Sequence, residues 1–125
     1  MNRILVIDDE DVVRMLVMEI LDAAGYAVSG AESAERALTL LETTDFDLVV
    51  SDVVMPGMSG PEVAQAVTSM RPGTQVLYIS GYTDSAVGNH GVLESGIAFL
   101  QKPFNADELS RKVREVLDSA VVPVD

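Results

Sequence analysis

The chain has 125 residues, the length of one domain with its own hydrophobic core, so we expect residues 1–125 to form a single domain. Hydrophobic residues make up 48% of it and charged residues 22%, a balance that excludes an intrinsically disordered chain. The net charge of −12, from 20 Asp and Glu against 8 Lys and Arg, argues against binding to nucleic acid or anionic lipid. The absence of cysteine and of any apolar stretch near about 18 residues favours a soluble cytoplasmic protein without disulfides or direct membrane contact.

Five short apolar runs predict β-strands, and four of them are almost continuously apolar, as in parallel strands covered on both faces. The predicted strands are Arg3–Ile7, Ala27–Gly30, Leu48–Ser51, Val76–Ser80 and Ile97–Gln101. Stretches with helical periodicity separate these runs. The sequence therefore predicts an α/β fold of the (βα)5 type, a doubly wound single parallel sheet of five strands.

Apolar residues at three- and four-residue spacing predict the helices between these strands. The residues expected to form the buried stripe of the first helix are Val13, Leu16, Val17, Ile20, Leu21 and Ala24, followed by Gly25 as a stop. Ser33 is expected to cap a second helix, and Pro61 to lie in the first turn of a third helix that turns Met70 toward the core. Asn105 and Glu108 predict a capping box at the start of the last helix.

The segment 84–96 is the weakest predicted helix. It contains Gly88, Gly91 and Gly96, and each glycine inside a helix costs roughly 1 kcal/mol relative to alanine. We expect this segment to be short, irregular or mobile. Its His90, the one histidine of the chain, is interpreted as an exposed residue.

Polar residues follow or end four of the predicted strands. They are Asp8 and Asp9, Asp52, Ser80 and Lys102. Taken singly, each has an ordinary explanation in helix capping or turn formation. The carboxyl ends of parallel strands meet at one edge, however, where ligands bind in such sheets. Clustered carboxylates repel one another unless a cation lies among them, and oxygen ligands suit Mg²⁺, which often has a phosphate partner.

At these residues the chain resembles the receiver domains of two-component response regulators, over about residues 3–118. The matching motifs are Ile7-Asp8-Asp9, Asp52 with the loop Met55-Pro56-Gly57-Met58-Ser59-Gly60, Ser80-Gly81 and Lys102-Pro103-Phe104. The resemblance implies a flavodoxin-like fold with strand order 2-1-3-4-5. It also implies a signalling switch in a phosphorelay, not a metabolic enzyme.

The same resemblance assigns a phosphoacceptor and a metal site. Asp52 is expected to take a phosphoryl group from a phosphohistidine on a sensor histidine kinase or a histidine phosphotransfer protein. Asp9, the Asp52 carboxylate and the Val54 backbone carbonyl are expected to bind Mg²⁺, and Asp8 to help through water. Val54 cannot orient a hydrolytic water, so we expect dephosphorylation not to be fast.

The resemblance further implies how the signal is read. Lys102 and Ser80 are expected to bind phosphoryl oxygens, and Ser80 to turn toward the phosphate while Phe99 fills the space it leaves. Many relatives have tyrosine at the position of Phe99. The expected output surface is the face of helix 4, strand 5 and helix 5, which is compatible with a homodimer. A cis peptide bond is expected between Lys102 and Pro103.

The segments Tyr78–Thr83 and Phe99–Phe104 look most like receivers fused to hybrid sensor histidine kinases. A fragment of such a kinase is therefore the favoured origin of the chain, and a stand-alone regulator is the alternative.

Two other classes of protein compete with this interpretation. A haloacid-dehalogenase-type phosphatase would use Asp9 as its nucleophile within Asp9-Glu10-Asp11-Val12-Val13, but it leaves Asp52 without a role. A cofactor-binding module of flavodoxin type lacks support because no glycine-rich phosphate loop follows the first strand. The other form of such a binding module, a receiver that takes no phosphate, is disfavoured because all five site residues are present.

Overall fold

The computed structural model describes residues 2–52, 60–80, 98–101 and 104–119. Its centre is one parallel sheet in the order β2-β1-β3-β4-β5. The strands are β1 Arg3–Ile7, β2 Ala27–Ala31, β3 Leu48–Asp52, β4 Gln75–Ser80 and β5 Ala98–Gln101. The predicted fold class and strand order are confirmed, and each strand lies within one residue of its predicted bounds.

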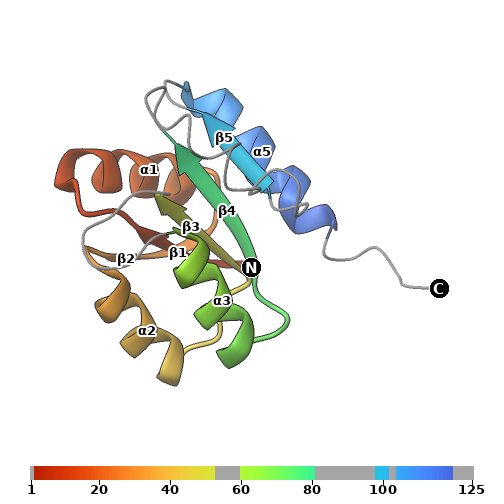
Figure 1. The fold of residues 1–125 in the computed structure, drawn as a ribbon. Helices are drawn as coiled ribbons and strands as arrows, with labels where there is room; N and C mark the ends of the chain where they lie inside the picture. Colours follow the sequence, from red (N-terminus) through yellow and green to blue (C-terminus); the bar gives the residue numbers. More distant parts are fainter. Residues whose placement is uncertain (1, 53–59, 81–97, 102–103, 120–125) are drawn as a thin grey trace.

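Helices cover both faces of this sheet. They are α1 Asp11–Ala23, α2 Ala34–Thr43, α3 Gly60–Met70 and α5 Ala106–Ser119. Figure 1 shows α1 and α5 on one face and α2 and α3 on the other. The helix expected within residues 84–96 falls outside the described residues. None of the helices in the described ranges is long and apolar enough to cross a membrane.

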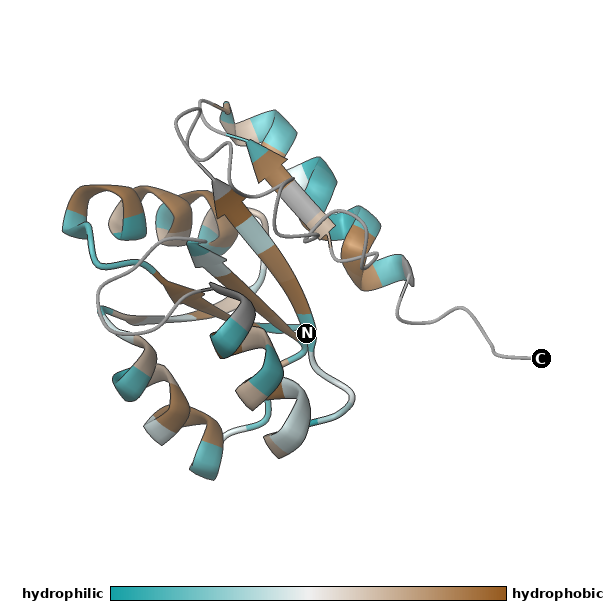
Figure 2. Cartoon of the chain, in the orientation of Figure 1, coloured by the Kyte–Doolittle hydropathy of each residue, from teal (hydrophilic) through white to brown (hydrophobic). Residues whose placement is uncertain are grey.

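The core has two layers, one on each face of the sheet. Under α1 and α5, buried side chains such as Val17 and Val113 pack on alternate residues of the central strands. Under α2 and α3, side chains such as Leu41 and Val67 pack on the intervening strand residues. Figure 2 accordingly shows the central strands mostly brown, whereas the helices change between brown and teal around their axes. The continuous apolar runs are therefore explained by burial on both faces.

The predicted caps are confirmed. The Ser33 hydroxyl accepts a hydrogen bond of 3.1 Å from the Arg36 amide at the start of α2. The Glu108 amide donates a hydrogen bond of 2.8 Å to the Asn105 side chain, and the Asn105 amide donates one of 2.9 Å to the Glu108 side chain. These two bonds form a capping box at the start of α5. Beyond the end of α1, Gly25 has a φ of 99°, a left-handed conformation that glycine adopts without strain.

Three helix positions differ from prediction. Leu16 is 50% exposed, Met70 is 36% exposed and Ala24 is exposed, although each was expected to face the core. In α1 the buried stripe is centred on Val17 and Leu21, and successive helical residues are rotated by about 100°. The stripe is thus narrower than the run of apolar residues, which leaves apolar surface on α1.

Candidate functional site

Two buried carboxylates lie at the carboxyl edge of the sheet. Asp52 is the last residue of β3 and is 7% exposed; Asp8 directly follows β1 and is 3% exposed. The strands β1 and β3 pair in parallel with Ile7 opposite Ser51. Asp8 follows Ile7 and Asp52 follows Ser51, so the two acids come at the same level of the sheet. The fold therefore places the two acids next to each other where ligands bind in doubly wound sheets.

A third carboxylate joins them. One carboxylate oxygen each from Asp8, Glu10 and Asp52 lies within 4.8 Å of the other two. Glu10 was not among the predicted site residues, although its two-residue spacing from Asp8 at a strand end was a usable signal. Asp9 is exposed and is not part of this group of three, and its role as a metal ligand stays a prediction. This set of hard oxygen donors fits Mg²⁺.

The turn between β1 and α1 holds Asp8 in place. The Glu10 amide donates a hydrogen bond of 2.9 Å to Asp8 Oδ1, and the Asp8 amide donates one of 3.2 Å to the Ala31 carbonyl. Arg14 donates from Nη1 to the Asp8 carbonyl at 2.9 Å and pairs through Nη2 with Asp11 at 2.6 Å. The backbone and the carboxylate of Asp8 are thus both anchored by the turn.

Asp52 is held by the centre of the sheet. It pairs in register with Ile79 of β4, and the buried Ser51 hydroxyl donates a hydrogen bond of 3.0 Å to the Asp52 carbonyl. The backbone of Ser80 comes one residue after Ile79, so Ser80 lies at the same edge of the sheet as Asp52. These backbone positions bring the predicted phosphoacceptor close to one of the two predicted phosphoryl-binding residues.

The remaining predicted residues can be placed only in part. Phe99 lies on β5, paired in register with Tyr78, but its side chain and that of Ser80 fall outside the description. Val54, Lys102 and the peptide bond that follows Lys102 also lie outside the described residues, as does His90.

Among the described residues, Tyr78 is the largest fully buried side chain, and it lies on β4 one residue before Ile79, the strand partner of Asp52. It pairs with Ser51 on one side and with Phe99 on the other. Burial raises the pKa of Tyr78 to about 12, because the low-dielectric interior disfavours the phenolate. The Tyr78 hydroxyl therefore keeps its proton to a higher pH than an exposed tyrosine does.

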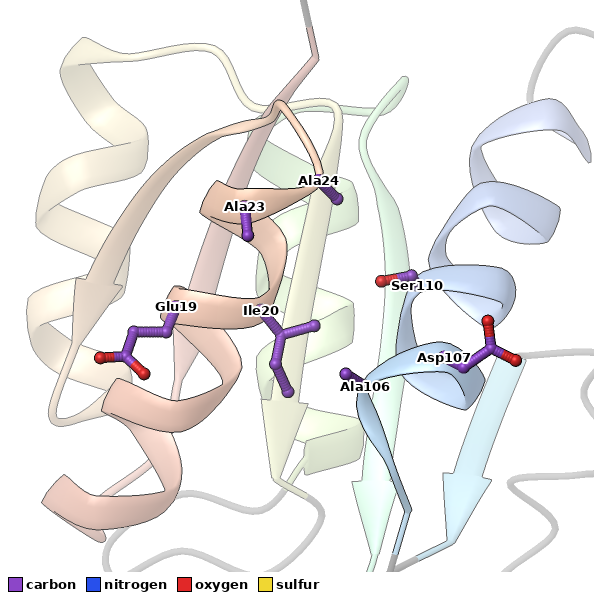
Figure 3. A pocket seen from close by; sticks show the side chains of 7 residues that line it. All are labelled: Glu19, Ile20, Ala23, Ala24, Ala106, Asp107 and Ser110. Atoms are coloured by element: carbon purple, nitrogen blue, oxygen red, sulfur yellow. The ribbon is translucent and has the colours of Figure 1, made fainter.

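A separate open groove of about 530 Å³ lies between α1 and α5 (Figure 3). Its lining residues are Glu19, Ile20, Ala23, Ala24, Ala106, Asp107 and Ser110. None of them belongs to the acidic group, and the lining combines an apolar floor with carboxylates that Figure 3 shows pointing outward. The groove offers no set of groups for phosphoryl chemistry, so the acidic edge is the candidate site.

Comparison with known proteins decides the family. The family model described as response regulator receiver domain matches residues 4–114. The chain belongs to the response regulator receiver domain family. It is therefore a receiver of two-component signalling, a switch module, and the phosphatase alternative finds no support.

Individual relatives agree with this assignment. The receiver is 36% identical over 117 residues to the sensor kinase CckA of Brucella abortus, covering 92% of this chain and 12% of that protein. It is 29% identical to the receiver protein CpdR of Brucella abortus, covering 96% and 100% of the two chains. It spans 32% of a cyclic di-GMP phosphodiesterase of Thermotoga maritima. Its curated relatives thus range from single receivers to much longer proteins.

Solved structures show the same fold. Vibrio cholerae chemotaxis protein CheY4 superposes with a TM-score of 0.83 at 32% identity, covering 93% of this receiver and 98% of that chain. NtrX from Brucella abortus superposes with a TM-score of 0.87 at 29% identity, covering 95% of this receiver and 27% of that chain. The flavodoxin-like arrangement is therefore shared along nearly the whole chain.

Proposed function

We propose that this receiver takes a phosphoryl group from a phosphohistidine onto Asp52 in a reaction that requires Mg²⁺. The observation that carries the proposal is the place of Asp52, a buried carboxylate at the carboxyl end of β3, with Asp8 and Glu10 within 4.8 Å. Burial of two such charges is costly unless a cation compensates them. A divalent cation would offset this charge and would also attract the oxygens of an incoming phosphoryl group.

The chemistry asks for a nucleophile in line with the donor, and Asp52 supplies it. A carboxylate oxygen of Asp52 attacks phosphorus, an O–P bond forms, the P–N bond of the donor breaks, and its electron pair returns to the imidazole. The product is an acyl phosphate, which water can hydrolyse. When bound, Mg²⁺ neutralises charge on the transferring oxygens. Asp8, Asp9, Asp52 and the Val54 carbonyl are the residues proposed to hold it.

Ser80 and Lys102 are proposed to bind the phosphoryl oxygens once the group is on Asp52. The position of Ser80 at the end of β4, one residue beyond the strand partner of Asp52, supports this role. Movement of Ser80 and Phe99 would then pass the change to the face formed by helix 4, strand 5 and helix 5. The site and the output surface would share β4 and β5, so a local rearrangement would be enough to link them.

The proposed donor is a sensor histidine kinase or a histidine phosphotransfer protein. Three apolar residues of α1 are exposed: Val12 by 80%, Met15 by 61% and Leu16 by 50%. The helix α1 begins directly after the turn that contains Asp8 and Glu10. An exposed apolar patch beside a reactive group is typical of a surface that binds another protein. These three residues, the α1 patch, support docking of the donor next to Asp52.

Phosphorylation with a small phosphodonor tests the function without knowledge of the natural donor. With acetyl phosphate and Mg²⁺, intact-mass spectrometry should show one added phosphoryl group on the wild type and on Asp22→Asn, a matched control on the exposed side of α1. Asp52→Asn should show none, and a chelator should abolish labelling of the wild type. Labelling of Asp52→Asn to the wild-type level would overturn the proposal.

A further inference from the structure

Glu10 takes an unusual position at the start of α1. It is the N-cap residue, where a side chain commonly accepts a hydrogen bond from the first turn, but the Glu10 side chain makes no such bond. One of its carboxylate oxygens lies instead within 4.8 Å of carboxylate oxygens of Asp8 and Asp52. The side chain therefore extends toward the carboxylates of Asp8 and Asp52 at the edge of the sheet.

The backbone fixes Glu10 from both sides. Its amide donates to Asp8 Oδ1 at 2.9 Å, and its carbonyl accepts a hydrogen bond of 2.9 Å from the Arg14 amide. The position of the Glu10 backbone beside Asp8 is thereby set. Asp8 and Asp52 are buried whereas Glu10 is exposed, so Glu10 approaches the group from the solvent side.

We propose that Glu10 is a further carboxylate of the cation site, beside Asp8 and Asp52, and strengthens Mg²⁺ binding before any phosphoryl group arrives. This inference rests on the proposed function, because it assigns a residue to the cation of that same site. Asp8, Glu10 and Asp52 together carry a charge of −3, which a divalent cation would largely offset. Mg²⁺ keeps several of its waters, so a carboxylate at this distance interacts with the ion directly or through one of them.

The charge of Glu10 acts in opposite directions on the two ligands. It attracts the cation, but it repels the phosphoryl group that later binds to Asp52. Removal of the charge should therefore weaken Mg²⁺ binding while leaving phosphorylation intact once Mg²⁺ is saturating. A unit charge at about 5 Å from a divalent ion, screened by water and by about 0.15 M salt, corresponds to a change in affinity of about three- to tenfold.

Calorimetric titration of the unphosphorylated receiver with Mg²⁺ tests the assignment. Glu10→Gln should weaken Mg²⁺ binding about three- to tenfold, and Glu10→Asp, which keeps the charge on a shorter side chain, should weaken it less. Glu42→Gln makes the same charge change on the exposed surface of α2 and should have little effect. The difference between Glu10→Gln and Glu42→Gln should persist at about 0.15 M salt, where charges far from the site are screened.

The outcomes separate this inference from the proposed function. If Glu10→Gln binds Mg²⁺ as tightly as Glu42→Gln, while the wild type still forms its acyl phosphate with Mg²⁺, only the role of Glu10 is overturned. If the wild type neither binds Mg²⁺ nor takes phosphate, both proposals are overturned. Weakened binding with normal phosphorylation at saturating Mg²⁺ is the expected result.

Discussion

The guanidinium of Arg14 donates a hydrogen bond of 2.9 Å to the backbone carbonyl of Asp8, across the turn that joins β1 to α1. Its second amino group pairs with Asp11, whose side chain is 75% exposed, whereas the Arg14 side chain is only 17% exposed. One partly buried cation thus connects the first helix to the strand end that carries the site. Arg14 is a positioning residue for Asp8.

Loss of this contact should destabilise the receiver. Arg14→Ala is expected to lower the free energy of unfolding by about 1–3 kcal/mol, because a charge-assisted hydrogen bond in a partly buried turn is removed. Asp11→Asn removes only the exposed ion pair and should cost less than about 1 kcal/mol. Urea unfolding measures both. Equal losses for the two variants would show that the bond to Asp8 contributes nothing beyond the surface pair.

On the opposite face, Arg71 connects α3 to the end of α2. Its Nε and Nη2 atoms donate to the Leu41 carbonyl at 3.0 and 2.9 Å, and Nη1 pairs with the exposed Asp45 at 2.7 Å. Arg71→Ala should cost about 1.5–3 kcal/mol in urea unfolding, and Arg71→Lys nearly as much, because lysine lacks the planar fork. Asp45→Asn is the control and should cost less than about 1 kcal/mol. Full rescue by lysine would argue for simple charge pairing.

The α1 patch predicts a defect in docking that spares the chemistry. Met15→Glu should lower the rate of transfer from a phosphohistidine protein by about tenfold or more, because it places a charge in an apolar contact. Its labelling by acetyl phosphate should stay at the wild-type rate. Met70→Glu introduces the same charge at an exposed position at the end of α3 and should affect neither reaction. If Met15→Glu and the wild type accept phosphate from the protein donor at equal rates, the α1 patch is not the docking surface.

Much of this architecture could be read from the sequence because its signals are local. Continuous apolar runs predict strands buried on both faces, and the Asn105 and Glu108 pair predicts the start of α5. The carboxyl edge could be anticipated from topology alone, since Asp8 and Asp52 end neighbouring strands of a parallel sheet.

Other features depend on packing that the sequence does not state. Leu16 has the spacing of a core residue but is 50% exposed, whereas Met18, on another side of α1, packs against the core. Gly30 of β2 leaves room for this side chain, since a Cβ at position 30 would lie against the Met18 sulfur. Glu10 was missed for a related reason: at a helix start an acid is ordinarily explained by capping, and only the turn geometry shows that it reaches Asp8.

The pKa of Tyr78 predicts a pH dependence at the alkaline end. Its folded-state pKa of about 12 exceeds the model-peptide value of 10.0, so the unfolded chain loses its proton first. The stabilisation from neutral Tyr78 is complete below pH 10 and is lost as the pH rises from 10 toward about 12. Tyr78→Phe should therefore lose less stability over that interval in urea titrations. An identical pH slope in both proteins would contradict burial as the cause.

The most direct test of the account is to locate the phosphoryl group chemically. After treatment with acetyl phosphate and Mg²⁺, borohydride reduces an aspartyl phosphate to homoserine, which tandem mass spectrometry assigns to a single position. The account predicts homoserine at position 52 and none at positions 8 and 9, with loss of the signal when Mg²⁺ is chelated. Homoserine at position 8 or 9 while residue 52 remains aspartate would contradict it.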